Sequence, residues 1–280
     1  MKRYDLSGRV IVITGSTGGL GRAAAQALRK RGAKLALFDL DVQAAKRQAT
    51  ELGDARVAQG WAADVCSMES LERAMSEAAR HFGGIDVVIA NAGVGYTEPM
   101  ETMTSRSFER TIDVNLNGVW RTFKTALPHV QERQGYMLAI SSMAAFVNAP
   151  LNAHYAASKA GVLAMCNSLR LEVKHLGVGV GTLHPTFFKT PMMDALMDSV
   201  CSEFVFNSYK GIWAFVELDK VIAALVSAIH ERRDIVTVPE RNALVARATG
   251  LIRPIIEKIG FSDARIAEAI RRSEEQCDHR

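Results

Sequence analysis

Cysteine is scarce in this chain of 280 residues, and its four cysteines are far apart. Cys66, Cys166, Cys201 and Cys277 form no CxxC pair. Disulfide-stabilised domains are dense in cysteine, so this pattern excludes a disulfide framework and indicates free thiols in a reducing compartment. We therefore predict a cytoplasmic protein, and we predict no metal site.

A long hydrophobic run is also missing. The longest stretch without Asp, Glu, Lys or Arg runs from residue 134 to residue 158 and contains Asn148, Pro150, Asn152 and His154. These residues exclude a membrane span, and the stretch instead predicts a strand followed by a long active-site loop. The first five residues lack the apolar core of a signal peptide.

Neither sign of charge dominates the chain. There are 34 Lys and Arg residues against 30 Asp and Glu residues, and no basic block stands out. Nucleic acid is therefore not an expected partner. No glycine-serine linker, repeat or charge run divides the chain, so we predict a single domain.

Short apolar runs alternate with longer segments of helical periodicity. The runs predict strands at Val10–Ile13, Lys34–Phe38, Arg56–Trp61, Ile85–Ile89, Tyr136–Ile140, Val178–Leu183 and Asp234–Val238. The segments between them predict helices at Gly19–Arg31, Val42–Leu52, Met68–Phe82, Ser107–Glu132, Ala153–Leu176 and Leu218–Glu231. This order predicts an α/β fold with a doubly wound, seven-stranded parallel sheet, helices on both faces, and ligands at the carboxyl ends of the strands.

Two segments do not fit this alternation. Residues 186–215 form an insert before the last helix of the pattern, and residues 241–280 form a helical extension after the last strand. We assign residues 1–240, insert included, to the main body of the domain. Pro128 should kink its helix or start a new turn there, and Pro254 should break the tail helix, because proline lacks an N–H donor.

A glycine-rich turn follows the first strand and opens the first helix. It comprises Gly15, Ser16, Thr17, Gly18, Gly19, Leu20 and Gly21. Glycines let the backbone approach a pyrophosphate at the positive end of the helix. Such a turn is weak evidence by itself, but the preceding strand, the following helix and an acid downstream strengthen it.

That acid is Asp39, which lies eighteen residues after Gly21 at the end of the second strand. A carboxylate there accepts hydrogen bonds from the adenosine ribose and repels a 2′-phosphate, and neither Gly18 nor Leu40 offers a positive charge to such a phosphate. The pattern favours NAD over NADP. In the alternative interpretation Asp39 caps the next helix, although Asp41 is also placed to do so. Asp64 and Val65 are equally suited to meet the adenine or to start a helix.

Tyr155 and Lys159 are four residues apart and therefore lie on one face of a helix. Ser142 precedes the tyrosine by thirteen residues and competes with Ser141 for a catalytic role. A cation lowers the pKa of a neighbouring acid by roughly 1–3 units, so we expect Lys159 to bring the phenol of Tyr155 toward neutral pH. In the alternative interpretation Tyr155 is a packing residue, but burying a lysine beside it would then be costly. We expect His154 and His184 to be structural.

These motifs together resemble the short-chain dehydrogenase/reductase family over roughly residues 6–240, which implies a Rossmann fold. The TGxxxGxG turn, the element Asn91, Ala92 and Gly93, the helix residue Asn115, Ser142, the Tyr-x-x-x-Lys pair, and Pro185, Phe188 and Thr190 match in order. Two positions depart from the family pattern: Ala90 stands for an asparagine and Thr186 for a glycine.

The resemblance implies a hydride-transfer enzyme. Tyr155 would exchange the alcohol proton, Ser142 would hold the substrate oxygen, and Lys159 would also hold the nicotinamide ribose. Asn115 would position a proton-relay water, and Phe188 and Thr190 would hold the nicotinamide carboxamide. A homodimer or homotetramer is expected from the resemblance alone.

The substrate site is expected beneath the insert, which is rich in aromatic residues and methionine. Its predicted wall consists of Val94, Tyr96, Met143, Phe146, Phe187, Met192 and Met193. Such a wall favours a hydrophobic alcohol or ketone as the substrate. In the alternative interpretation, half of these side chains pack against the sheet. The apolar tail could lie on a membrane surface, contact a partner subunit or cover the site, and its mixed charges favour packing.

Three functions fit the sequence. The first is an NAD-dependent alcohol dehydrogenase or ketone reductase of the short-chain type. The second is an NADPH-dependent carbonyl or acyl-thioester reductase, which Asp39 disfavours. The third is a non-catalytic nucleotide-binding scaffold or redox sensor, which the retained Tyr155 and Lys159 disfavour.

Overall fold

The computed structural model describes residues 4–197 and 205–278, without the side chains of 195–197 and 274–278. Within them a single sheet has the strands β1 (Val10–Thr14), β2 (Lys34–Asp39), β3 (Ala58–Ala62), β4 (Val87–Ala90), β5 (Tyr136–Ile140), β6 (Gly179–Pro185) and β7 (Ile235–Val238). Residues 198–204 of the predicted insert, and Cys201 with them, lie outside the described part of the chain.

The strands alternate with helices, as the sequence predicts. The helices of the sheet-forming part are α1 (Gly19–Arg29), α2 (Val42–Leu52), α3 (Met68–Phe82), α4 (Ser105–Ile112), α5 (Gly118–Glu132), α6 (Ala153–Val173) and α9 (Leu218–Glu231). Short 3-10 turns lie at Met143–Ala145, Lys174–Leu176, Asn207–Tyr209, Gly211–Trp213 and Glu240–Asn242, and α7 (Pro191–Met197) begins the insert. The tail forms α10 (Ala243–Arg247), α11 (Thr249–Gly260) and α12 (Asp263–Asp278).

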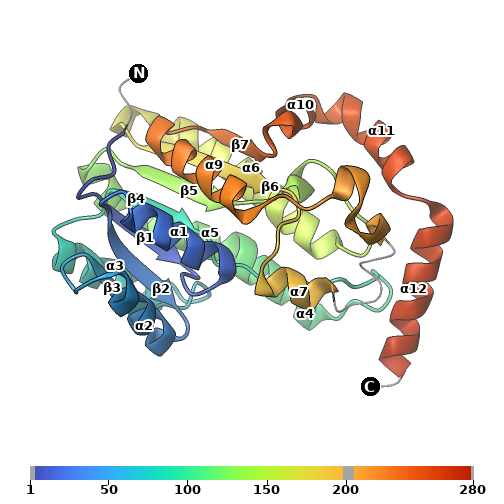
Figure 1. The fold of residues 1–280 in the computed structure, drawn as a ribbon, viewed down its shortest axis with the longest axis horizontal. Helices are drawn as coiled ribbons and strands as arrows, with labels where there is room; N and C mark the ends of the chain where they lie inside the picture. The colour runs from blue at the N-terminus through green and yellow to red at the C-terminus, as the bar shows by residue number, and fades with distance from the viewer. Residues whose placement is uncertain (1–3, 198–204, 279–280) are drawn as a thin grey trace.

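All strand pairs are parallel, and the order is β3-β2-β1-β4-β5-β6-β7. Side chains alternate between the two faces along each strand. In β1, Ile11 and Ile13 join a core under α1 and α9, whereas Val10 and Val12 join a core under α3, α5 and α6. The central strands are therefore buried on both sides, and helices cover both faces of the sheet, which confirms the predicted α/β fold (Figure 1).

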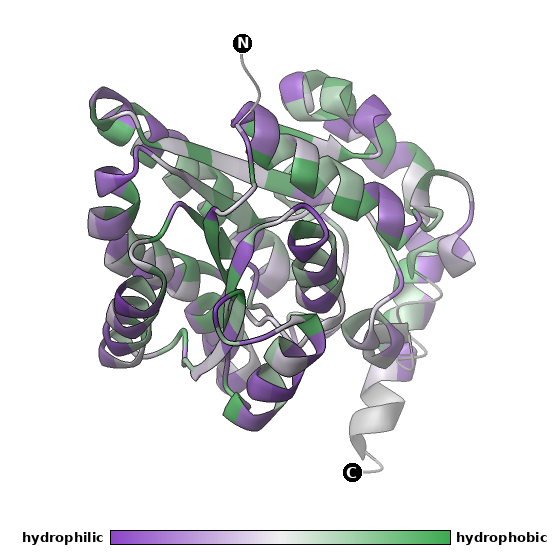
Figure 2. Ribbon diagram, turned by 60° about the vertical axis from the view of Figure 1, so that its left-hand side comes forward, coloured by the Kyte–Doolittle hydropathy of each residue, from purple (hydrophilic) through white to green (hydrophobic). Residues whose placement is uncertain are grey.

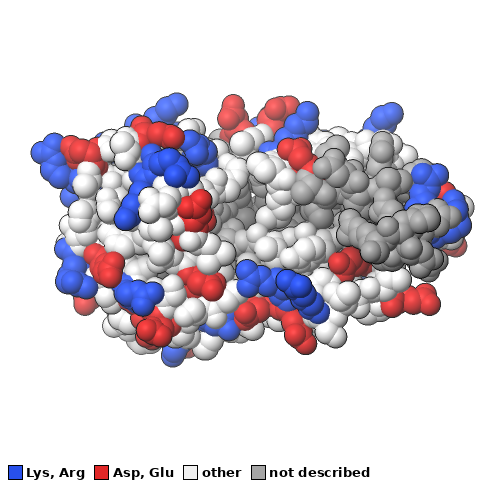
Figure 3. Space-filling view, turned by 90° about the horizontal axis from the view of Figure 1, so that it is seen from below, with Lys and Arg blue, Asp and Glu red and all other residues white. Residues whose placement is uncertain are grey.

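Hydrophobic residues concentrate in the central strands, whereas hydrophobic and hydrophilic residues alternate along the surrounding helices (Figure 2). Local signals set the ends of these helices. The Ser67 side chain accepts a hydrogen bond from the Ser70 amide at the start of α3, and Gly83 ends that helix with a φ of 82°. On the face seen in Figure 3, Lys and Arg are interspersed with Asp and Glu.

Two predictions about helices were wrong. The predicted helix Ser107–Glu132 is interrupted by a π-helical turn, η1 (Asp113–Asn117), which carries Asn115. Pro254 lies inside α11 rather than at a break, and α10 and α11 instead end at Arg247 and Gly260. α5 continues through Pro128 to Glu132.

The tail leaves β7 and arches past the carboxyl ends of the strands (Figure 1). It is held to the insert by a separate apolar cluster, in which Phe206 and Trp213 contact Phe261 with ring centroids 6.4 Å and 5.0 Å apart. The insert and the tail therefore form one layer over the end of the sheet where the predicted site lies.

Candidate active site

The glycine turn lies where the strand order reverses, between the carboxyl ends of β1 and β4. Gly15 has a φ of 61°, and a Cβ there would lie 2.9 Å from the Cα of Ala92. The side-chain amide of Asn91 donates to the carbonyls of Thr14 and Gly15 at 3.0 and 2.9 Å. The motifs after β1 and β4 are thus locked together at the position where doubly wound sheets bind nucleotides.

The structure places Asp39 beside this turn. Its carboxylate accepts hydrogen bonds from the amide and hydroxyl of Thr17 at 3.0 and 2.8 Å. The helix cap is made by Asp41, whose side chain accepts from the Ala44 amide at 2.9 Å. Asp39 therefore does not cap α2, and its charge is held at the end of β2.

Asp64 follows β3 and also does not cap a helix, because Ser67 caps α3. The Asp64 carboxylate accepts from the Cys66 amide at 2.8 Å, and Asp64 and Val65 line the same cavity as Asp39. The predicted cap role of Asp64 is therefore not found, and its contact with adenine stays a prediction.

The two serines after β5 have different surroundings. Both serines line the cavity, but Ser141 is buried, and its hydroxyl donates to the carbonyl of Lys159 at 3.1 Å. The Ser142 hydroxyl accepts from the Ala144 amide at 3.2 Å and acts on the Tyr155 phenol, whose pKa it lowers. Ser142 is therefore the serine that can reach a ligand beside Tyr155.

Lys159 lies one turn beyond Tyr155 on α6. Its Nζ is 5.5 Å from the centre of the Tyr155 ring and donates to the Ile140 carbonyl at 2.9 Å. Burial lowers the pKa of Lys159 to about 8. Burial raises the pKa of Tyr155 above 10.0, against the opposing effect of the Ser142 hydrogen bond. The predicted lowering of the pKa of Tyr155 by Lys159 is thus not found in this structure, and burial of the phenol sets the direction of the shift.

Asn115 is fully buried in the π-helical turn. Its carbonyl oxygen accepts from the Val94 amide at 2.8 Å, and its amide donates to the Val94 carbonyl at 2.9 Å and to the Ser158 hydroxyl at 3.3 Å. The Asn115 side chain thus holds the segment that follows Gly93, and this segment lies next to Lys159. Both of its N–H groups are used, so any water placed by this turn would bind the backbone.

The segment after β6 lies on the glycine turn. A Cβ at Gly19 would be 3.0 Å from Cγ2 of Thr190, and the Thr190 hydroxyl accepts from the Met193 amide at 3.2 Å. Pro185, Phe188 and Thr190 all line the cavity. The two histidines do not. His184 bonds the Ser142 carbonyl at 3.0 Å and the Thr182 hydroxyl at 2.7 Å, whereas His154 is buried and stacks on Tyr96.

One cavity of about 840 Å³ connects these groups. Its predicted residues are Gly15, Thr17, Gly18, Gly19, Leu20, Asp39, Asp64, Val65, Asn91, Ala92, Gly93, Val94, Tyr96, Ser142, Met143, Tyr155, Lys159, Pro185, Phe187, Phe188, Thr190, Met192 and Met193. Besides the buried Asn115, three predicted site residues lie outside this lining. Ser16 is buried beneath the turn, Gly21 is buried in α1, and Phe146 packs on His184 with ring centroids 4.7 Å apart. The structure therefore corrects the predicted substrate wall at Phe146.

The sequence interpretation missed the contribution of the tail. Arg241, Asn242, Val245 and Ile256 line the cavity, as does Arg110 of α4. The apolar spacing of the tail was visible in the sequence, but it did not indicate which surface the tail covers. Of the three roles considered for the tail, the structure supports that of a cover over the site.

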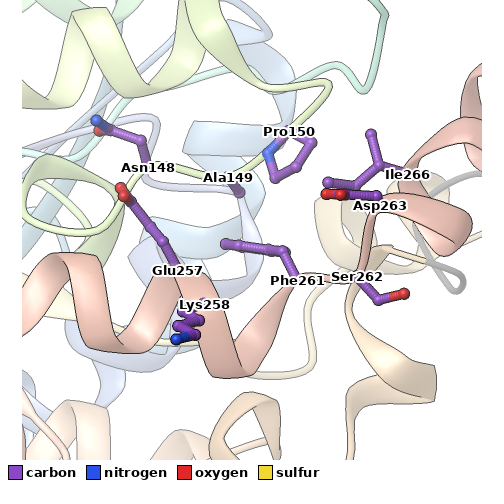
Figure 4. Close-up of a pocket in the computed structure, with 9 residues that line it drawn as sticks. All are labelled: Asn148, Ala149, Pro150, Glu257, Lys258, Phe261, Ser262, Asp263 and Ile266. Carbon is purple, nitrogen blue, oxygen red and sulfur yellow. The ribbon is translucent and has the colours of Figure 1, made fainter.

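A second hollow of about 730 Å³ lies between the loop Asn148–Pro150 and the corner of α11 and α12. Figure 4 shows Glu257 and Phe261 of the tail reaching toward this loop. Ala149 lines both hollows. The tail is therefore packed on the loop that follows Ser142, and a shift of α11 would alter the shape of both hollows.

Among the described residues, no group of three or more His, Cys, Asp or Glu side chains is arranged to hold a metal. Nor does any helix of the described chain have the length and apolar character needed to cross a bilayer. The described cysteine side chains, Cys66 and Cys166, form no disulfide.

The sequence and the fold match known proteins. The family model "short chain dehydrogenase" matches residues 9–200. The chain is 32% identical to the 3-oxoacyl-[acyl-carrier-protein] reductase of Vibrio cholerae over 195 residues, covering 69% of this chain and 79% of that protein. It is 32% identical to human 3-hydroxyacyl-CoA dehydrogenase type-2 over 266 residues, covering 89% of this chain and 97% of that protein.

The structure of a short chain dehydrogenase/reductase from Burkholderia phymatum in complex with NAD shares the fold. That structure has a TM-score of 0.77 and 24% identity, with 91% of this chain and 96% of that chain covered. The structure of the 3-ketoacyl-(acyl-carrier-protein) reductase of Brucella melitensis, complexed with NADH, has a TM-score of 0.74 and 26% identity. The match covers 83% of this chain and 97% of that chain. The chain belongs to the short-chain dehydrogenase family, whose members are NAD(P)-dependent oxidoreductases acting on hydroxyl and keto groups.

Proposed function

We propose that this oxidoreductase uses NAD to interconvert a hydrophobic secondary alcohol and its ketone. The observation that carries the proposal is one continuous cavity with Asp39 and the glycine turn at one end and Ser142, Tyr155 and an apolar wall at the other. When bound, NAD supplies the hydride acceptor, and the protein supplies position and proton transfer.

The residues at the first end fit a dinucleotide. Gly15, Gly18 and Gly19 line the cavity without side chains, at the amino end of α1, where a phosphate is favoured. Asp39 is fixed by Thr17 and presents a negative charge, which a ribose diol accepts and a 2′-phosphate does not. This argues for NAD and against the NADPH-dependent alternative, carbonyl or acyl-thioester reduction.

The proton transfer is assigned to Tyr155. Because burial raises its pKa, the phenol carries its proton at neutral pH and is ready to donate to a ketone oxygen. In alcohol oxidation the phenolate must form first, and Lys159, whose ammonium has a pKa of about 8, is the cationic side chain next to the ring at neutral pH. Ser142 and Tyr155 line the same part of the cavity, which supports a substrate oxygen held between their two hydroxyls.

The character of the wall supports an apolar substrate. Val94, Met192, Met193 and Phe187 from the main body meet Val245 and Ile256 from the tail. The acidic residues of the lining, Asp39 and Asp64, lie at or just after the ends of β2 and β3, whereas its basic residues are Arg110, Lys159 and Arg241. A hydroxysteroid dehydrogenase of Eggerthella lenta is 34% identical over 67% of this chain, which is consistent with a bulky apolar alcohol.

We also propose a homo-oligomer that forms through α5 and α6. Trp120 on α5 and Leu171 on α6 are 47% and 67% exposed, although both are large and apolar. Burial of such residues against a second copy would remove them from water. Sedimentation of the purified chain, with Trp120→Ser as the variant, tests this point.

A panel of apolar secondary alcohols, assayed with NAD and with NADP by nicotinamide absorbance, tests the function. We expect turnover with NAD and with long apolar alcohols. Activity confined to sugars or small hydroxy acids would refute the substrate class, and a preference for NADP would refute the cofactor. Tight NAD binding without any turnover would instead support the nucleotide-binding scaffold.

A further inference from the structure

The outer side of α11 carries a stripe of exposed hydrophobic residues. Leu251, Ile255 and Ile259 recur every four residues, so they lie on one side of the helix, and they are 79%, 58% and 71% exposed. Leu244 on the preceding helix is 66% exposed. We call Leu244, Leu251, Ile255 and Ile259 the tail stripe. Large apolar side chains gathered in this way indicate a surface that contacts a partner.

The tail stripe continues at the end of α11. Ile212 of the insert is 55% exposed, and its Cδ1 would lie 3.3 Å from a Cβ placed on Gly260. Residues of the same two segments, Ile256 and Trp213, line the cavity. One helix therefore separates the active site from the stripe.

Basic residues outnumber acidic ones in this segment. Between Ala243 and Gly260 the one acid is Glu257, and it is paired with Arg253 at 3.4 Å. In the described part of the chain, Arg247 and Lys258 form no hydrogen bond or ion pair. Both are exposed and therefore free to meet an anionic surface. Apolar residues flanked by basic ones are the pattern of helices that lie in a membrane interface.

We propose that the tail stripe docks on an anionic lipid membrane. The apolar side chains would enter the boundary between headgroups and acyl chains, and Arg247 and Lys258 would contact the phosphates. A second copy of the same stripe fits less well, because it would bring unpaired cations of like sign together. No spanning helix is needed for this contact.

The consequence for the enzyme rests on the proposed function. An apolar alcohol partitions into lipid, and a site that is covered by a membrane-docked helix can receive it from there. Membrane binding itself is independent of which substrate is used, so the two ideas can fail separately.

The full chain should be tested for co-sedimentation with vesicles of phosphatidylcholine alone and with vesicles that contain phosphatidylglycerol. We expect binding to the anionic vesicles and its loss in high salt. Leu251→Ser should lower the bound fraction at least tenfold, and the similarly exposed Met100→Ser on the loop before α4 should not. Both variants should keep wild-type turnover of a water-soluble alcohol, which shows that they fold.

Arg247→Glu and Lys258→Glu should weaken binding to anionic vesicles and leave the oligomeric state unchanged. The proposal is overturned if the wild type stays in solution with both vesicle types, or if Leu251→Ser binds like the wild type. It is equally overturned if Leu251→Ser dissociates an oligomer in light scattering without changing vesicle binding, since a second copy would then occupy the stripe.

Discussion

The two ends of the cavity are built in different ways. The cofactor end consists of short turns directly after β1, β2, β3 and β4, held by backbone contacts such as that of Gly15 with Ala92. The substrate end consists of side chains from the insert and the tail, which are far from those turns in the sequence. The first end depends on where the backbone lies, and the second depends on which apolar side chains fill a space.

The largest expected effect is at a glycine of the cofactor end. Gly15→Val places a β-branched side chain at a φ of 61° and against Ala92. The strain and collision should cost roughly 2–5 kcal/mol of folding free energy and lower the Tm by roughly 5–10 °C. NAD affinity, measured by calorimetry, should fall more than a hundredfold, if the turn holds the cofactor.

Gly8→Val is the matched control, because Gly8 has a φ of 72° and open space around it. It should lower the Tm by strain alone and leave NAD affinity unchanged. Equal losses of affinity in the two variants would show that Gly15 acts through stability and not through the cofactor site.

A smaller effect is expected at Asp39. Asp39→Ser removes the charge that repels a 2′-phosphate and leaves the hydrogen bond from Thr17 possible. The ratio of kcat/KM with NAD to that with NADP should fall roughly tenfold to a hundredfold, equivalent to about 1.4–2.7 kcal/mol. An unchanged ratio would remove Asp39 from cofactor selection.

At the substrate end, neighbouring isoleucines of α11 give a direct contrast. Ile256 lines the cavity, and Ile255 points to solvent. Ile256→Ala should lower kcat/KM for a long apolar alcohol about tenfold and leave NAD affinity unchanged. Ile255→Ala should leave turnover of a dissolved alcohol unchanged, and an equal loss in both variants would argue against the tail as a wall of the site.

The smallest effects are those of pH on the two reaction directions. The raised pKa of Tyr155 keeps the phenol protonated at neutral pH. Ketone reduction should therefore be constant near pH 7 and fall as pH rises through that pKa. Alcohol oxidation needs the phenolate and should rise over the same range. Stopped-flow rates measured in both directions from pH 7 to well above pH 10 check this opposition of slopes.

The difference between the two ends also explains what the sequence could predict. The glycine turn, Asp39, Ser142, Tyr155 and Lys159 each follow a strand or share a helix face, so local spacing was enough to place them. The choice of Ser142 over Ser141 followed from the same spacing, and the bonding of Ser141 to Lys159 agrees with it.

Other features depend on contacts between distant segments. The π-helical turn at Asn115 lies in a sequence of continuous helical periodicity, and its bonds to Val94 and Ser158 belong to the folded chain. Phe146 is apolar like the wall residues, yet it packs on His184. The pKa of Tyr155 rises because the phenol is buried, which spacing does not reveal.

The most direct test of the account is the turnover of Tyr155→Phe with NAD and the best apolar alcohol, with NAD affinity measured in parallel. Tyr155→Phe removes the proton-transfer group and leaves the ring and the cofactor end in place. We expect turnover to fall by roughly 10²–10⁴-fold with NAD affinity within a fewfold of the wild type. Near-normal turnover would contradict the assignment of Tyr155 and, with it, the proposed chemistry of the site.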